Sequence, residues 1–316
     1  MVARKRGWRL AGLASLGFAA ALALSGCSFD EAVHGFGWFK GITPQGRRMY
    51  ELWIGSCIAA LVVGVFVWGL IFWCIVRYRK RSEELPPQTR FNMPLEFLYT
   101  FVPFLVVSVL FYYTAVAQTY VNHKTPNPDV VVDVIAFKWN WKFQHTSVDG
   151  ADVSGPAGQP ITTIGASDYV PVLVVPTGKR IEFREHSQDV VHSFWVPEML
   201  FKRDVFPGER EGKPVLENSF QVTIDREGAF VGRCAELCGA YHAAMNFEVR
   251  ALNPDLFDRY LQLRQQANPA TNAPYTAGEA LQALNCGQWC APAAITTYPF
   301  KTNRTVRSAS QPPAGS

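Results

Sequence analysis

The chain has 316 residues, of which 48% are hydrophobic and 13% aromatic, and its formal net charge is +4. A mean hydropathy of +0.02 is low for a polytopic membrane protein, whereas the aromatic content is high for a uniform soluble domain, so we expect a membrane part and a polar part. Basic clusters at residues 4–6 and 77–81 flank apolar runs without a nucleic-acid motif. Membrane topology explains them better, and nucleic acid is not an expected partner.

Residues 1–26 have the layout of a secretory signal, with a basic start, an apolar stretch and small residues before a cysteine. The ending Leu24-Ser25-Gly26-Cys27 resembles the lipobox of bacterial lipoproteins. In such proteins the cysteine is acylated and becomes the first mature residue. We therefore expect export and lipidation of Cys27, with a plain signal peptide and an incidental cysteine as the alternative.

A transmembrane hairpin is expected over residues 45–122, with spans at about 52–76 and 95–117. Each run is long enough to cross the roughly 30 Å of a bilayer core. The connecting loop is rich in arginine and lysine, which places it on the cytoplasmic side. Everything after about His123 is then extracytoplasmic, in agreement with an exported N-terminus.

An all-β domain is expected over residues 125–268, because β-branched runs alternate with turn signals. This pattern favours a sandwich or a barrel. Residues 149–168 are expected to form a loop, and residues 255–266 a short helix. The rest, 269–316, is rich in Ala, Pro, Thr, Asn and Ser, and we expect an irregular extension. The expected strands are 130–137, 170–175, 180–185, 219–224 and 247–251.

The segment from Cys234 to Met245 carries a metal-binding pattern in which Cys238 and His242 follow Cys234 at four-residue intervals. Two thiolates can bridge two metals, while an imidazole and a thioether can complete the coordination. Soft sulfur with imidazole favours copper or zinc. His192 could reach the same site if the two loops meet at one end of a sandwich. A Cys234–Cys238 disulfide and a structural zinc site are the alternatives, although neither explains Met245.

These motifs resemble subunit II of haem-copper cytochrome c oxidase, from the hairpin to about residue 252. In that family a D-V-x-H-S-x-x-V-P loop and a C-x-E-x-C-x3-H-x2-M loop bind the binuclear copper centre called CuA. The resemblance implies an all-β cupredoxin-like sandwich that holds two copper ions. It also implies that Glu236 offers its carbonyl to copper and its side chain to a Mg²⁺ or Mn²⁺ shared with subunit I. The implied copper ligands are His192, Cys234, Glu236, Cys238, His242 and Met245.

The resemblance assigns two further roles. Trp139 matches the surface tryptophan that accepts electrons from cytochrome c, although Asn140 stands where the family usually has tyrosine. Glu96 matches a carboxylate at the entrance of a proton channel in subunit I. Trp139 could otherwise be an ordinary strand aromatic, and Glu96 an interfacial carboxylate that faces water.

The implied function is transfer of electrons from cytochrome c through CuA to haem in subunit I, where O₂ is reduced to water and protons are pumped. The lipobox and phrases such as Phe194-Trp195-Val196-Pro197-Glu198 resemble the actinobacterial branch. In that branch the donor is the dihaem cytochrome c of a bcc complex, within a supercomplex. Subunits I and III and the lipid of a bacterial cell membrane are the other implied partners.

No C-x-x-C-H motif is present, so the chain is expected to bind no c-type haem. Cys286 and Cys290 are expected to form a local disulfide in an exported segment. Three other functions are possible: a quinol oxidase subunit, which lacks the copper ligands; a copper-delivery protein; and an anchored structural domain with a Cys234–Cys238 disulfide.

Overall fold

The computed structural model describes residues 35–38, 40–85, 87–210, 213–214 and 218–296. The chain divides into two units, residues 1–39 and 40–316, and every helix and strand among the described residues belongs to the second. The expected signal segment and Cys27 lie outside the described residues.

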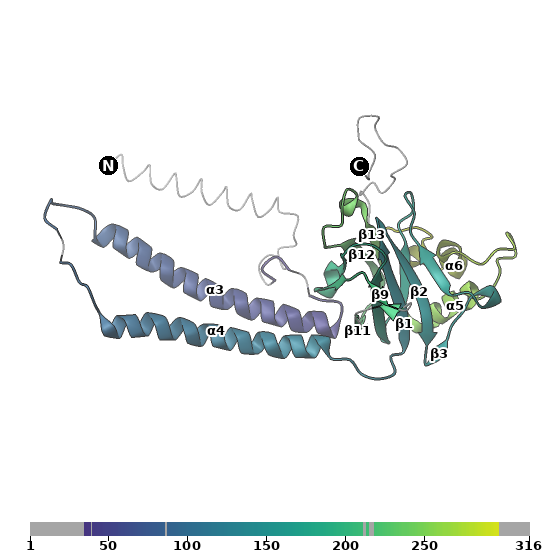
Figure 1. The fold of residues 1–316 in the computed structure, drawn as a ribbon, viewed down its shortest axis with the longest axis horizontal. Coiled ribbons are helices and arrows are strands. Elements are labelled where there is room, and N and C mark those ends of the chain that lie inside the picture. Colours follow the sequence, from purple (N-terminus) through teal and green to yellow (C-terminus); the bar gives the residue numbers. More distant parts are fainter. Residues whose placement is uncertain (1–34, 39, 86, 211–212, 215–217, 297–316) are drawn as a thin grey trace, which may run out of the picture. The chain divides into compact units, whose positions relative to one another are not determined.

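Two long helices come first. Helix α3 (Pro44–Arg77) and helix α4 (Met93–Asn122) contact each other and run side by side as an antiparallel pair (Figure 1). At 1.5 Å per residue they are about 51 and 45 Å long, more than a bilayer core requires. Both are long and apolar enough to cross a membrane. They extend past the expected spans because capped polar turns continue each helix; at α3, the Thr43 hydroxyl accepts the Gly46 N–H.

A β domain follows, built from two sheets and a small ribbon (Figure 1). The six-stranded sheet has the order β11-β6-β1-β2-β3, with β4 paired to β2. Its strands are β1 (Val130–Phe137), β2 (Asn140–Val148), β3 (Ala151–Asp152), β4 (Ile161–Ile164), β6 (Arg180–Ser187) and β11 (Ser219–Thr223). The five-stranded sheet has the order β5-β13-β12-β7-β8. Its strands are β5 (Val172–Pro176), β7 (His192–Val196), β8 (Phe201–Val205), β12 (Gly228–Cys234) and β13 (Asn246–Leu252), while β9 (Glu209–Arg210) pairs with β10 (Lys213–Pro214).

The core lies between the two sheets because alternate side chains of each strand point inward. Phe143 from the first sheet packs against Phe247 from the second, with ring centroids 5.5 Å apart. Trp141 packs edge-on against Phe194 and Phe247 and is fully buried. Aromatic rings therefore fill the space between the sheets near the chain's cysteine-rich loop. The predicted fold class, two long apolar helices followed by an all-β sandwich domain, is confirmed.

Short helices complete the domain. Helix α5 (Pro254–Arg264) matches the short helix expected from the sequence, and 3₁₀ turns lie at Pro156–Gly158, Pro197–Met199, His242–Ala244 and Gly287–Cys290. The expectation of a loop over 149–168 was wrong at β3 and at β4, both of which pair with β2.

The expectation of an irregular extension after residue 268 was also wrong in part. Residues Ala277–Leu284 form helix α6, which a capping box between Thr276 and Glu279 begins. Its apolar face, including Leu281 and Leu284, joins the main core. Its buried residues recur at helical spacing (Ala277, Ala280, Leu281, Leu284), but over only two turns inside a segment rich in Ala, Pro, Thr, Asn and Ser, so composition alone did not predict it. The packed domain therefore reaches at least to residue 296.

Candidate metal centre

The expected ligands meet at one end of the five-stranded sheet. His192 is the first residue of β7, Cys234 is the last residue of β12, and Met245 directly precedes β13. Strand β12 lies between β7 and β13, with Cys234 opposite Phe194 in the β7 register. Strand pairing thus brings together two ligands that lie 42 positions apart in the sequence.

The donor atoms form a chain of near-equal separations. The Cys234 and Cys238 sulfurs are 3.8 Å apart, and His192 Nδ1 lies 3.8 Å from the Cys234 sulfur. On the other side, His242 Nδ1 and Met245 Sδ lie 3.6 and 3.8 Å from the Cys238 sulfur. Two sulfurs bound to one tetrahedral metal at about 2.3 Å would lie roughly 3.7 Å apart. The spacing is therefore that of donors that share metal ions.

The cluster is buried and its cysteines are free. Donor atoms of His192, Cys234 and Cys238 all lie within 4.8 Å of one another, and all three residues are buried. The Glu236 carbonyl oxygen lies 3.2 Å from the Cys234 sulfur. A sulfur separation of 3.8 Å is far beyond the roughly 2.05 Å of a disulfide, so the disulfide alternative does not describe this structure. Soft sulfur and imidazole donors in this arrangement fit copper.

The electrostatics favour one thiolate. The hydrogen bond from the Cys238 thiol lowers the pKa of Cys234 well below its usual range, and a further hydrogen bond from His192 acts in the same direction. The same contact with Cys234, together with burial, raises the pKa of Cys238. Burial alone would lower the pKa of His192, but its hydrogen bonds to Cys234 and Asp189 raise it. The pocket therefore stabilises a negative sulfur, the form that binds a metal cation.

Asp189 is a functional candidate to which the sequence patterns assigned no role. Its Oδ1 accepts a hydrogen bond from His192 Nε2 at 2.8 Å, which leaves Nδ1 facing Cys234. Its Oδ2 accepts the backbone N–H of Lys138 at 2.7 Å. A carboxylate behind a ligating histidine fixes the ring orientation and the tautomer. The signal was present in the sequence, because Asp189 is the first residue of the D-V-x-H-S-x-x-V-P motif and precedes His192 by three residues.

Trp139 contacts the ligand loop directly. Its indole Nε1 donates to the Cys238 carbonyl at 3.0 Å, and its ring lies edge-on to Tyr241 at a centroid distance of 5.0 Å. Gly239 permits this approach, because a Cβ there would lie 3.1 Å from the indole, and its φ of +122° is one that other residues rarely adopt. Trp139 is half-buried and packs against the core.

Trp141 and Asn140 are core residues. The Trp141 side chain is fully buried, and its Nε1 donates to the Met245 carbonyl at 3.2 Å. It therefore fixes the end of the loop that runs from Cys234 to Met245. Asn140 is also buried, and its side chain bonds to Ala166 and to the Trp141 N–H. The asparagine therefore holds the β2 start against the following loop.

Glu96 and Glu236, the two carboxylates with expected roles, lie in different surroundings. Glu96 is in the first turn of α4, where its carboxylate accepts the Asn92 N–H at 2.9 Å. It lies about 40 Å along the helix from Asn122, the residue that leads into the β domain. The Glu236 side chain is half-buried and belongs to no cluster of three or more potential metal ligands among the described residues.

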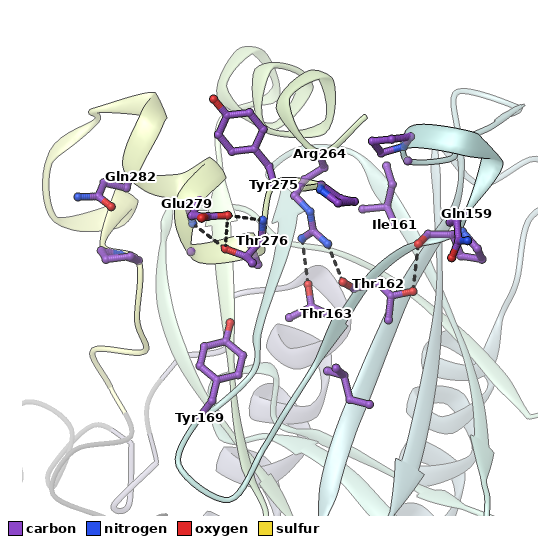
Figure 2. A pocket seen from close by; sticks show the side chains of 18 of the residues that line it. Gln159, Ile161, Thr162, Thr163, Tyr169, Arg264, Tyr275, Thr276, Glu279 and Gln282 are labelled. Atoms are coloured by element: carbon purple, nitrogen blue, oxygen red, sulfur yellow. Dashed lines mark hydrogen bonds between the residues drawn. The ribbon is translucent and has the colours of Figure 1, made fainter. Parts of the chain in front are cut away.

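A separate pocket of about 1010 Å³ lies between α5, α6 and the 155–164 segment, and none of the metal-cluster residues lines it. Figure 2 shows Arg264 directed toward Thr162 and Thr163, to which it donates hydrogen bonds. The Glu279 carboxylate in this pocket is engaged by Thr276. The Arg264 and Glu279 side chains are thus engaged in hydrogen bonds within the protein.

The comparisons with known proteins agree with the site. Residues 130–252 match the family model described as cytochrome c oxidase subunit II, periplasmic domain. The chain is 48% identical to the probable cytochrome c oxidase subunit 2 of Nocardia farcinica, over 97% of this chain and 92% of that one. It is 46% identical to the cytochrome c oxidase subunit 2 of Mycobacterium bovis, over 95% and 91%.

The chain belongs to the cytochrome c oxidase subunit II family. The predicted family is therefore confirmed, and relatives of this subunit in actinobacteria match almost the whole chain. The subunit II match includes the β strands and the metal cluster, so the domain is of the CuA type. The periplasmic domain of subunit II of cytochrome oxidase of Bradyrhizobium japonicum aligns with 44% of this chain and 95% of its own, at 24% identity and a TM-score of 0.36, and adds no argument.

Proposed function

We propose that the chain accepts electrons from a cytochrome c at Trp139 and passes them through a binuclear CuA centre to haem in subunit I. O₂ reduction to water and proton pumping then belong to the assembled oxidase, an oxidoreductase in which this chain acts only as a subunit. The observation that carries the proposal is the row of sulfur and nitrogen donors at 3.6–3.8 Å spacing, in which every residue but the half-buried His242 is buried.

Copper bound there would take up and release one electron at a time. The proposed ligands are His192, Cys234, Cys238, His242 and Met245 through their side chains and Glu236 through its carbonyl. Burial of His192, Cys234, Cys238 and Met245 limits the access of water, and Asp189 holds the His192 ring in one orientation. The Cys234 N–H also bonds to the Met245 carbonyl, so the two ends of the loop are tied together. Fixed ligands limit rearrangement when the charge of the centre changes.

Trp139 is the proposed point of electron arrival. Its hydrogen bond to the Cys238 carbonyl links a half-exposed indole to a proposed ligand through a single contact. Tyr241 packs on the same ring and keeps it against the loop. The Asp189 bond to Lys138 N–H fixes the residue before Trp139 as well, so one carboxylate positions both sides of the path.

Two carboxylates have proposed roles at the contact with subunit I. The half-buried Glu236 side chain is proposed to bind Mg²⁺ or Mn²⁺ together with groups of that subunit. Glu96 is proposed to mark the entrance of a proton channel. Its position at the first turn of α4, the end linked to the arginine- and lysine-rich loop, supports proton uptake from the cytoplasm.

The proposed setting is a bacterial cell membrane, with α3 and α4 as spans and residues 125–268 outside. Residues 1–26 would be removed and Cys27 lipidated. Proposed partners are subunits I and III and the dihaem cytochrome c of a bcc complex in a supercomplex. The arginine- and lysine-rich loop between the helices supports this orientation.

The test is spectroscopy on the full chain purified in detergent and loaded with copper. We expect a purple protein with two coppers per chain and a seven-line EPR signal, in which one electron is shared by both metals. Substituting Cys234 or Cys238 by serine should abolish the signal, whereas C57S, a free cysteine within α3, should leave it intact. A colourless protein without titratable thiols, or one with a single zinc, would reject the proposal.

A further inference from the structure

Strand β13 carries two charged side chains that are completely buried. Glu248 and Arg250 alternate with Phe247 and Val249 along the strand, so the charges lie on the face opposite the aromatic core. The Arg250 Nε donates to Glu248 Oε1 at 3.1 Å. In a sandwich this outer face ordinarily meets water, and a buried ion pair there requires a cover.

The cover is a segment that we name the strap, residues 286–296. Arg250 Nη1 donates to the carbonyls of Trp289 and Ala291 at 2.6 and 3.2 Å, and Nη2 donates to the Ala293 carbonyl at 3.3 Å. The strap therefore lies across the outer face of the strand that begins one residue after Met245.

The other half of the ion pair binds the end of the strap. Glu248 Oε2 accepts the N–H groups of Ile295 and Thr296 at 2.7 and 2.8 Å, and the Thr296 hydroxyl at 2.7 Å. Most of the hydrogen bonds between the pair and the strap thus involve main-chain atoms of the strap. The apolar contacts of the strap are concentrated at its start, where Cys290 is buried in the core and Cys286 and Trp289 pack against it. Farther along, Pro292 and Ala293 are exposed and Ile295 is 41% exposed.

The end of the strap, residues 291–296, can separate from the strand without exposing a large apolar surface, because Pro292, Ala293 and Ile295 are already exposed. When the strap lifts, Glu248 and Arg250 regain hydration, which offsets much of the lost hydrogen bonding. The groups that residues 291–296 lose from the ion pair are mainly peptide N–H and C=O groups. A covalent constraint within it is the disulfide between Cys286 and Cys290, which closes the turn that presents the Trp289 and Ala291 carbonyls to Arg250.

We propose that the strap is a thiol-controlled latch: reduction of the Cys286–Cys290 disulfide releases residues 289–296 from the Glu248–Arg250 pair. The reductant is a dithiol. Its first thiolate attacks the sulfur of Cys286, which is half-buried beside the exposed Gly287 and Gln288, and buried Cys290 leaves as a thiolate and is protonated. The second thiol of the reductant then closes its own disulfide and frees the Cys286 thiol, so two electrons and two protons pass to the chain.

The test is hydrogen exchange, measured by mass spectrometry on the copper-loaded full chain in detergent. The reporters are the Ile295 and Thr296 amides, which Glu248 protects in the latched state. Dithiothreitol should speed their exchange by about tenfold or more, the order that closing a short loop contributes. The double variant C286S/C290S should exchange at the fast rate without reductant and should not respond to it.

Reference amides lie in the β1–β6 ladder of the other sheet, for example Val134 and Phe183. Their exchange should stay constant. Equal exchange of Ile295 and Thr296 in the wild-type chain and C286S/C290S would overturn the latch. A uniform rise across both sheets would overturn it too, because the disulfide would then stabilise the whole domain. A second variant, E248Q, should speed exchange at the two reporters even in the oxidised chain.

Discussion

Asp189 Oδ1 lies 2.8 Å from His192 Nε2, on the side of the ring that faces away from Cys234. The same carboxylate also accepts the backbone N–H of Lys138. Burial alone would raise the pKa of Asp189, but these hydrogen bonds lower it, which keeps the carboxylate ionised. One side chain therefore joins a proposed ligand to the strand turn that carries Trp139.

Replacing Asp189 by alanine should weaken copper binding by about 10–100-fold, because His192 loses the partner that fixes its ring. Competition against a chelator, with the purified full chain, measures this change. D149A is the matched control, since Asp149 pairs with Lys179 at an exposed position. Equal copper affinity in D189A and D149A would show that the carboxylate does not support the site.

Replacing Trp139 by phenylalanine removes the hydrogen bond to the Cys238 carbonyl and keeps an aromatic ring beside Tyr241. We expect electron transfer from cytochrome c to slow by at least about tenfold, equal to about 1.4 kcal/mol of barrier, with an unchanged copper content. Stopped-flow reduction of the assembled oxidase measures the rate. Y241F, which preserves the ring contact, should behave like the wild-type protein. A W139F rate equal to that of Y241F would argue against electron arrival at Trp139.

Gly239 and Gly150 allow two effects of an added methyl group to be separated. Both have positive φ, +122° and +79°, but a Cβ meets the Trp139 ring only at Gly239, while nothing lies within 4 Å at Gly150. Each substitution by alanine should cost about 1 kcal/mol in backbone strain. G239A alone should also displace Trp139 and slow electron transfer, as seen by the same stopped-flow assay. If G150A slows transfer equally, the contact with Trp139 is not the cause.

His145 should make the domain sensitive to acid. Its Nε2 donates to the Val174 carbonyl at 2.8 Å, and complete burial lowers its pKa from 6.5 to about 4. Between pH 6.5 and about 4, His145 binds a proton in the unfolded chain but stays neutral in the folded chain. Stability is therefore fully present above pH 6.5 and falls as pH drops toward about 4, by about 3 kcal/mol in total.

Thermal unfolding of the copper-free full chain in detergent measures this loss. H145Q has no titrating ring, and its amide can still donate toward Val174. Its melting temperature should fall less than that of the wild-type chain when the pH is lowered from about 7.5 to about 4.5. Parallel decreases in the two proteins would assign the acid sensitivity to other groups.

The candidate metal site could be predicted from the sequence because most of its proposed ligands are close together in the chain. Cys234, Cys238, His242 and Met245 occupy one loop, and the spacing alone indicated a soft metal. The proximity of His192 to Cys234 depends on the pairing of β7 with β12, which the spacing of the residues does not reveal. The role of Asp189 could not be predicted, because the sequence does not show that its carboxylate points toward the His192 ring. The role of Trp139 is implied by the family resemblance.

The fold was less accessible where tertiary contacts outweigh local preference. Strand β4 has four residues with two threonines at its centre, and its pairing with β2 stabilises it. The main chain of the strap is held by hydrogen bonds to Glu248 and Arg250, and such bonds leave no apolar pattern in the sequence. A prediction based on hydrophobic patterns misses both segments, since neither is held by a pattern of apolar side chains.

The order of the five-stranded sheet has a consequence for how copper would leave the protein. The ligand-bearing strand β12 and the strand after Met245, β13, are interior, and the edges are β5 and β8. Edge strands open by local fluctuations far more readily than interior ones. Fraying at β5 or β8 therefore leaves the ends of β12 and β13 beside Cys234 and Met245 paired. Release of a bound metal would then depend on opening of the loop between these two strands and not on the edges of the sheet.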